Sequence, residues 1–139
     1  MNLSDQFVSN LDKENGVLAW RVLGLLNVEN ANKAADLIRS SIVELKAKGP
    51  VKLLVDNRLV KAFPPQVNEI WDTLQREILP QVDKCAIICS GMVMRMQMNR
   101  VAQATGFSGV TQSFWDEDPS KAIADACEFI GVKSNALVK

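Results

Sequence analysis

Short apolar runs alternate with amphipathic segments along most of this chain of 139 residues. A short apolar run bounded by turn residues predicts a buried strand, whereas apolar positions that repeat every three or four residues predict a helix. The pattern predicts strands at residues 17–23, 51–56, 85–89 and 110–114. A helix is predicted after each strand, at residues 28–48, 64–80, 90–105 and 118–130. The chain therefore contains four predicted strand–helix units.

A β-hairpin is predicted before the first of these units. Residues 6–11 form its first strand, and residues 12–16 form a turn in which Asn15 and Gly16 can adopt positive φ angles. The strand at 17–23 follows directly. The hairpin adds one antiparallel strand to the sheet.

The order of these elements predicts the fold class. Crossovers between parallel strands are right-handed, so we expect α/β architecture: a single wound (βα)4 superhelix on a mostly parallel five-stranded sheet with an N-terminal antiparallel hairpin. Residues 85–89 are apolar on both faces, which is typical of a central strand covered on both sides. The more polar run at 110–114 is predicted nearer an edge. We expect one domain over residues 1–139, with a frayed tail at 132–139.

The amino-acid composition limits the kinds of catalytic and metal site that the protein can contain. The sequence contains no histidine and no tyrosine, and neither of the Gly-rich phosphate-binding patterns occurs. Histidine-dependent nucleophiles and ordinary zinc sites are thereby excluded. We expect no catalytic residue, no metal and no cofactor, and hence no enzyme. The 16 basic residues balance the 16 acidic ones, so no nucleic-acid partner is predicted.

The cellular location is predicted from the N-terminal sequence, the length of the apolar stretches and the cysteines. The N-terminus shows no signal-peptide pattern, and no apolar stretch approaches the roughly 20 residues of a membrane span. Of three cysteines, Cys85 and Cys89 lie too far apart on one strand to form a disulfide. We therefore expect reduced, buried thiols in a cytoplasmic protein without an integral membrane segment.

Ligands usually bind parallel sheets at the carboxyl ends of the strands. The loop after strand 51–56 supplies five candidate binding residues: Asp56, Asn57, Arg58, Lys61 and Phe63. Asp56 and Arg58 either form a binding pair, or Asp56 caps the loop and pairs with a neighbour. The side chains of Arg58 and Lys61 are expected to be exposed and to contribute little to stability.

The next such loop holds Ser90 and Gly91 at the start of the third helix. Free backbone amides at a helix N-terminus can bind an anion, but these two residues also suit an ordinary helix cap. Cys89 precedes the same helix, whose dipole can lower the pKa of a thiol. Its place inside an apolar strand favours an inert core thiol instead.

The third helix contains four methionines within seven residues. At helical spacing, Met94 and Met98 share one face, and Met92 and Met96 point to the opposite side. Either both faces are covered within the monomer, or Met92 and Met96 form an exposed apolar patch for a protein partner, a second copy of the chain or a lipid. A homodimer that buries this face or the exposed side of the hairpin is predicted.

The order of elements resembles the sulfate-transporter and anti-sigma-factor-antagonist (STAS) family, and within it the stand-alone bacterial SpoIIAA-like branch. The segments that carry the resemblance are VLAWRVLG, VKLLVD, IWDTL, CAIICSG and FWDEDPSKAIADACEFI. Signalling members of the family present a phosphorylatable serine in a D-S-[ST]-G-like motif at the start of the second helix. The matching stretch, DNRLVKAFPPQVNEIW, has no serine or threonine between Asp56 and Trp71. The resemblance therefore does not extend to that phosphorylation switch.

Two functions from different classes remain open. The resemblance implies a non-catalytic interaction or regulatory module that uses the loop after Asp56 and the following helix for contacts with an unidentified protein. The alternative is a carrier or sensor of a small apolar or lipid ligand, which Phe63, Trp71 and the methionines suggest and which similar CRAL-TRIO-like folds also imply. An enzyme that uses Asp56, Arg58 or Cys89 is the least favoured reading.

Overall fold

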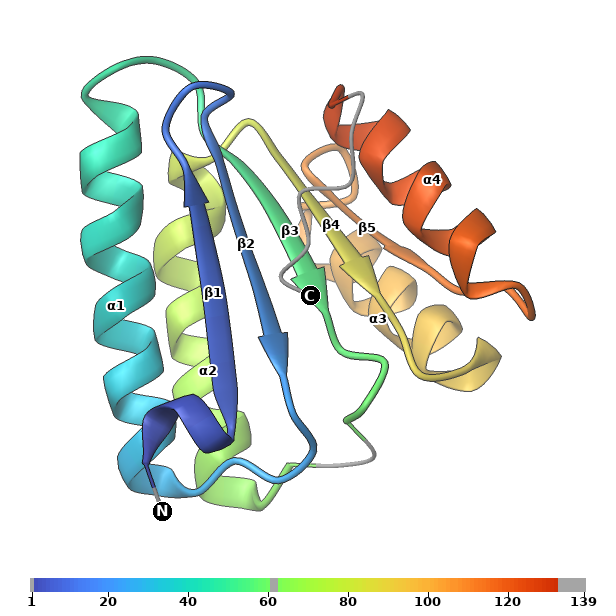
Figure 1. The fold of residues 1–139 in the computed structure, drawn as a ribbon. Coiled ribbons are helices and arrows are strands. Elements are labelled where there is room, and N and C mark those ends of the chain that lie inside the picture. Colours follow the sequence, from blue (N-terminus) through green and yellow to red (C-terminus); the bar gives the residue numbers. More distant parts are fainter. Residues whose placement is uncertain (1, 61–62, 133–139) are drawn as a thin grey trace.

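The computed structural model describes residues 2–60 and 63–132. Within these residues a five-stranded sheet has the order β1-β2-β3-β4-β5 (Figure 1). The strands are β1 (Phe7–Asp12), β2 (Val17–Val22), β3 (Lys52–Asp56), β4 (Lys84–Ile88) and β5 (Thr111–Phe114). The helices are α1 (Val28–Lys46), α2 (Pro65–Ile78), α3 (Met92–Thr105) and α4 (Pro119–Ile130), with short 3-10 turns η1 (Leu3–Asp5) and η2 (Leu79–Gln81). The tail expected to fray lies almost wholly outside the described residues.

The predicted fold class is confirmed. Strand β1 is antiparallel to β2, whereas β2, β3, β4 and β5 are mutually parallel. In the hairpin turn, the Asp12 carboxylate accepts hydrogen bonds from the backbone nitrogen and the side-chain amide of Asn15. Gly16 has a φ of +69°, and a Cβ there would lie 2.8 Å from the carbonyl oxygen of Pro50. The turn therefore requires glycine for both its conformation and its space.

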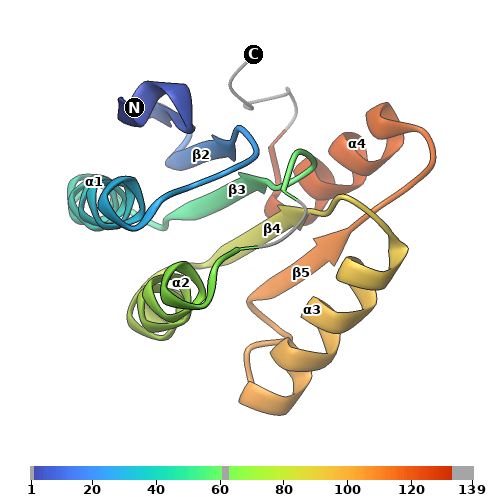
Figure 2. The same ribbon diagram turned by 90° about the horizontal axis from the view of Figure 1, so that it is seen from below.

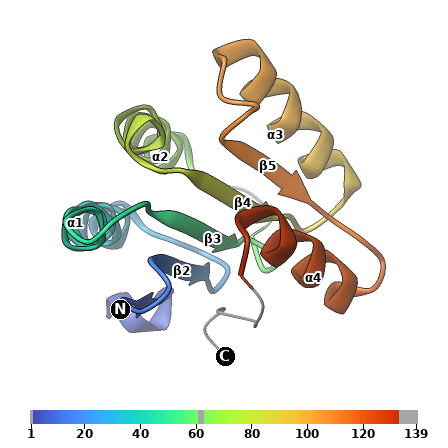
Figure 3. The same ribbon diagram turned by 90° about the horizontal axis from the view of Figure 1, so that it is seen from above.

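The helices cover the two faces of the sheet unequally. Helices α1, α2 and α3 lie on one face and α4 lies on the other, as the end-on views show (Figures 2 and 3). Helix α4 covers the far face because that face is also apolar, with Leu54, Ala86 and Ile88 buried against it. Strand β4 is thus buried on both sides and β5 lies at the edge, as the sequence predicted.

Two apolar clusters form the core. The larger cluster joins the sheet to α1 and α2, and α1 fits closely because it presents small side chains at Ala31, Ala34 and Ala35. The smaller cluster joins α4 to β3, β4 and β5. Among the described residues, no helix is long and apolar enough to cross a membrane.

Candidate functional site

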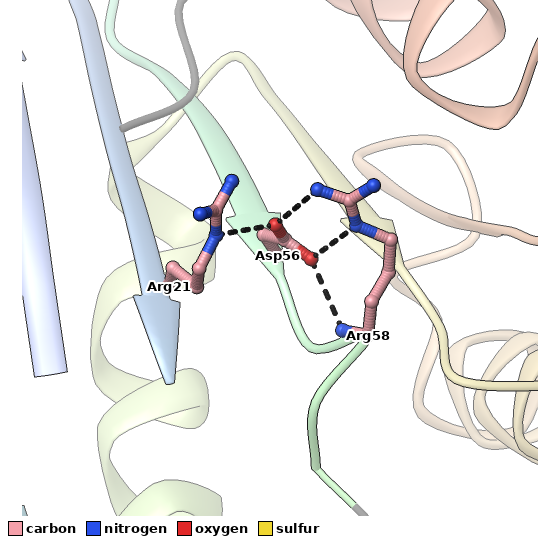
Figure 4. Close-up of polar contacts among 3 residues, drawn as sticks. All are labelled: Arg21, Asp56 and Arg58. Carbon is pink, nitrogen blue, oxygen red and sulfur yellow. Dashed lines mark hydrogen bonds and ion pairs between the residues drawn. The ribbon is translucent and has the colours of Figure 1, made fainter. Parts of the chain in front are cut away.

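Asp56 forms an ion-pair cluster at the carboxyl end of β3 (Figure 4). Its side chain is 1% exposed, and its Oδ2 accepts a 2.7 Å hydrogen bond from Arg21 Nε. Arg58 donates from Nε to Oδ1 at 2.9 Å and from Nη2 to Oδ2 at 2.8 Å. The backbone nitrogen of Arg58 also donates to Oδ1. Asp56 therefore closes the first turn of the loop and ties it to β2.

These contacts fix the charge of the cluster. Burial acting alone would raise the pKa of Asp56, but hydrogen bonds from Arg58 and Arg21 outweigh it and hold the pKa below its usual value. Hydrogen bonding to the Asp56 carboxylate in turn raises the pKa of the Arg58 guanidinium. Two guanidinium groups facing one carboxylate leave one positive charge at this edge of the sheet. The prediction that Arg58 is exposed and contributes little to stability is inconsistent with these contacts. Its side chain is only 29% exposed and forms an ion pair with the buried Asp56 carboxylate.

The other described candidates of this loop lie on the opposite face of the sheet from the Asp56 side chain. Asn57 and Phe63 line a cavity on that face. Lys61 lies outside the described residues. Gly91 is the N-cap residue of α3, and the Ser90 hydroxyl donates to the Met94 sulfur at 3.5 Å. Anion binding at Ser90 and Gly91, like partner binding at Asp56 and Arg58, stays a prediction.

The cavity lies between α2 and α3 and has a volume of about 540 Å³. It exists because α2 packs chiefly against α1, whereas α3 packs against β5, so the two helices diverge over the sheet (Figure 3). Its wall and floor are formed mainly by apolar side chains from β3, β4, α2 and α3, among them Val55, Ile87, Trp71, Leu74, Met94 and Met98. The rings of Phe63 and Trp71 lie 6.1 Å apart at one end.

Three buried polar atoms in the cavity lining have no hydrogen-bond partner among the described residues: Trp71 Nε1, Asn57 Oδ1 and Thr111 Oγ1, the last of which lies beside the Cys85 thiol. A buried donor or acceptor without a partner costs about 1–3 kcal/mol of stability, so such groups usually meet a ligand or water. Sequence reasoning placed Trp71 in the core and did not single out this polar edge of its ring.

The buried thiols are chemically quiet. Burial raises the pKa of Cys85 to about 12, against a small opposing effect of the Thr111 hydroxyl. Burial also raises the pKa of Cys89 to about 11. Because the thiolate is the reactive form, both sulfurs are unreactive near neutral pH. The structure thus favours the inert reading of Cys89, and Cys85 contributes to the cavity lining.

The methionines divide as the helical spacing predicted. Met94 and Met98 face the sheet and line the cavity. Met92 and Met96 point outward and are 44% and 55% exposed. Of the two readings of this helix, the monomer therefore shows the exposed patch. What covers the patch, including a second copy of the chain, stays a prediction.

Arg21 was missed by sequence reasoning, although the sequence carries a signal for it. It interrupts an otherwise apolar strand, VLAWRV, just as Asp56 ends the apolar strand KLLVD. In the parallel register of β2 and β3, these two residues are directly paired. A basic and an acidic residue at matched ends of neighbouring strands predict an ion pair.

Comparison with known proteins supports the fold. No family model matches the chain, and no curated protein matches it. Among solved structures, an uncharacterised DUF3478-family protein with a SpoIIAA-like fold from Shewanella loihica aligns with a TM-score of 0.65 and 18% identity, over 88% of this chain and 94% of that one. A proposed anti-sigma factor antagonist from Thermotoga maritima aligns with a TM-score of 0.53 and 13% identity, over 86% of this chain and 93% of that one. The chain therefore has a SpoIIAA-like fold.

Proposed function

We propose that this protein is a non-catalytic, STAS-like regulatory module that binds a small apolar molecule between α2 and α3. The observation that carries the proposal is the apolar cavity of about 540 Å³. Pockets for small ligands usually measure roughly 300–1,000 Å³, with mostly apolar walls and a few polar groups. The cavity combines that size with walls of aromatic, aliphatic and methionine side chains.

The state of the Asp56 carboxylate and of the buried thiols is consistent with ligand binding and does not suggest catalysis. The Asp56 carboxylate forms ion pairs with two arginines, and the buried thiols of Cys85, in the cavity lining, and Cys89 are held protonated. Methionine side chains are flexible and polarisable, so Met94 and Met98 can adjust to the shape of a ligand. The likeness to a proposed anti-sigma factor antagonist supports a regulatory use of such binding.

The proposal is tested with a neutral fluorescent probe, 1-N-phenylnaphthylamine. We expect saturable 1:1 binding with a rise in fluorescence as the probe leaves water. Met98→Trp should fill part of the cavity and abolish most of the binding. Met96→Trp makes the same substitution two residues away on the exposed side of α3, and it should bind like the wild type. Equal binding by both variants, or no saturable binding by the wild type, would refute the cavity as a ligand site.

An interaction surface is a second candidate. Exposed apolar side chains lie on α3 and on the loops that follow β2 and β3: Met92, Val93, Met96, Leu25 and Leu59. Exposed apolar patches on monomers commonly mark contacts with other molecules. Substitution of Leu25 and Leu59 by serine should leave probe binding unchanged. If this surface binds a protein partner, the substitutions should abolish pull-down of that partner by the tagged protein.

A further inference from the structure

We infer that the cavity ligand carries an uncharged polar group, such as a hydroxyl, and that the cavity rejects carboxylates. The inference rests on the proposed function and adds the chemistry of the ligand. It combines two observations: the placement of the unpaired polar atoms and the sign of the charges around the cavity.

Two of the unpaired polar atoms, Asn57 Oδ1 and Trp71 Nε1, belong to one end of the cavity. Asn57 directly follows β3, at the carboxyl edge of the sheet, and Trp71 lies against Phe63 from the same loop. The opposite end is mainly apolar, with Leu79 and Phe107 near the amino ends of β4 and β5, and the Thr111 hydroxyl there lies beside the Cys85 thiol. A ligand with one polar end and one apolar body matches this division.

The two atoms also indicate which hydrogen-bonding groups the polar end of the ligand must carry. Trp71 Nε1 is a donor, so it needs an acceptor on the ligand. Asn57 Oδ1 is an acceptor, so it needs a donor. A hydroxyl or an amide provides both functions, whereas an ionised carboxylate provides acceptors only. A carboxylate would therefore leave Asn57 Oδ1 unpaired and in repulsion with its charge.

The charges around the cavity act in the same direction. Among the described lining residues, the charged side chains are Glu69 and Asp72, and none is a lysine or arginine. On the exposed side of α2, Asp72 Oδ2 forms an ion pair with Arg76 Nη2 at 3.0 Å. Glu69 has no ion pair among the described residues. An anionic ligand would find no lysine or arginine among the described lining residues to balance its charge, and the exposed carboxylates of Glu69 and Asp72 would add a weak, salt-dependent repulsion at the rim.

The test measures competition with 1-N-phenylnaphthylamine by decan-1-ol and by decanoate at pH 8, each kept below its micelle concentration. These two competitors share a chain and differ in the head group. We expect decan-1-ol to displace the probe at a concentration at least about tenfold lower than decanoate, a difference of about 1.4 kcal/mol. Trp71→Phe should weaken decan-1-ol binding about two- to tenfold, the usual effect of losing one hydrogen bond, and should leave binding of the probe nearly unchanged.

The charge argument has its own variant. Glu69→Gln combined with Asp72→Asn should strengthen decanoate binding several-fold and leave decan-1-ol unchanged. If decanoate displaces the probe as well as decan-1-ol does, the inference is overturned while the proposed function stands. If the probe does not bind saturably, the proposed function fails and the inference fails with it.

Discussion

Replacement of Arg58 by alanine should destabilise the protein far more than loss of a surface arginine normally does. Arg58 donates two side-chain hydrogen bonds to the Asp56 carboxylate, which is 1% exposed. Each hydrogen bond to a charged group contributes about 1.5–3 kcal/mol. Arg21 remains on the carboxylate, water can enter where the Arg58 side chain stood, and the variant avoids a cost of up to about 2 kcal/mol for ordering an arginine side chain on folding. We therefore expect a net loss of about 2–3 kcal/mol, below the cost of breaking a fully buried pair.

The assay is urea denaturation at pH 7, with Arg76→Ala as the matched control. Arg76 also pairs with an aspartate, but its side chain is 75% exposed, and such a pair contributes about 0.3–0.5 kcal/mol. The pKa of Asp56 is depressed, so its ion pairs stabilise the folded state above the unfolded pKa of about 3.9 and are lost as pH falls through the folded value. The difference between wild type and Arg58→Ala should therefore shrink below about pH 4. Equal midpoints for Arg58→Ala and Arg76→Ala would refute this account of the cluster.

Three further predictions concern packing, the hairpin turn and assembly. Ile88→Ala, on the α4 face, should lower the free energy of unfolding by about 3–4 kcal/mol in denaturation experiments. Ile87→Ala should lower it by about 1 kcal/mol less, because Ile87 already borders a cavity. Equal losses would contradict the position of the cavity. Gly16→Ala should lower stability by about 1–3 kcal/mol because of its positive φ and the close carbonyl, and an unchanged melting temperature would argue against the turn conformation. Met92→Glu with Met96→Glu should convert the predicted homodimer into a folded monomer in sedimentation experiments. A wild-type monomer at high micromolar concentration would dispose of the dimer.

The sheet could be predicted because each strand carries its own local signal. The run from Cys85 to Cys89 is apolar at every position, and the structure places β4 there, one residue earlier. Helix α4 was delimited by Asp118 and Gly131, which act as its N-cap and its left-handed C-cap. Such signals depend on neighbouring residues only, so they survive without knowledge of the tertiary structure.

The cavity could not be predicted in the same way. It depends on the distance between α2 and α3, which is set by the separate contacts of α2 with α1 and of α3 with β5. Helical spacing placed Trp71 and Met94 on inward faces, and this was correct. Spacing does not show whether an inward face meets another side chain or an empty volume. The orphaned Trp71 Nε1 is likewise visible only once its surroundings are known.

The order of the strands in the sheet is the order in which the chain is synthesised. The parallel crossovers span 29, 27 and 22 residues, at positions 23–51, 57–83 and 89–110, so each strand pairs with the one made just before it. No strand has to insert between two that are already paired, and each closure involves a loop of modest entropy cost. The sheet can therefore grow from the hairpin one unit at a time as the chain leaves the ribosome. Helix α3 and strand β5, which come late in this order, complete the second wall of the cavity, so the cavity can bind a ligand only after β5 has joined the sheet.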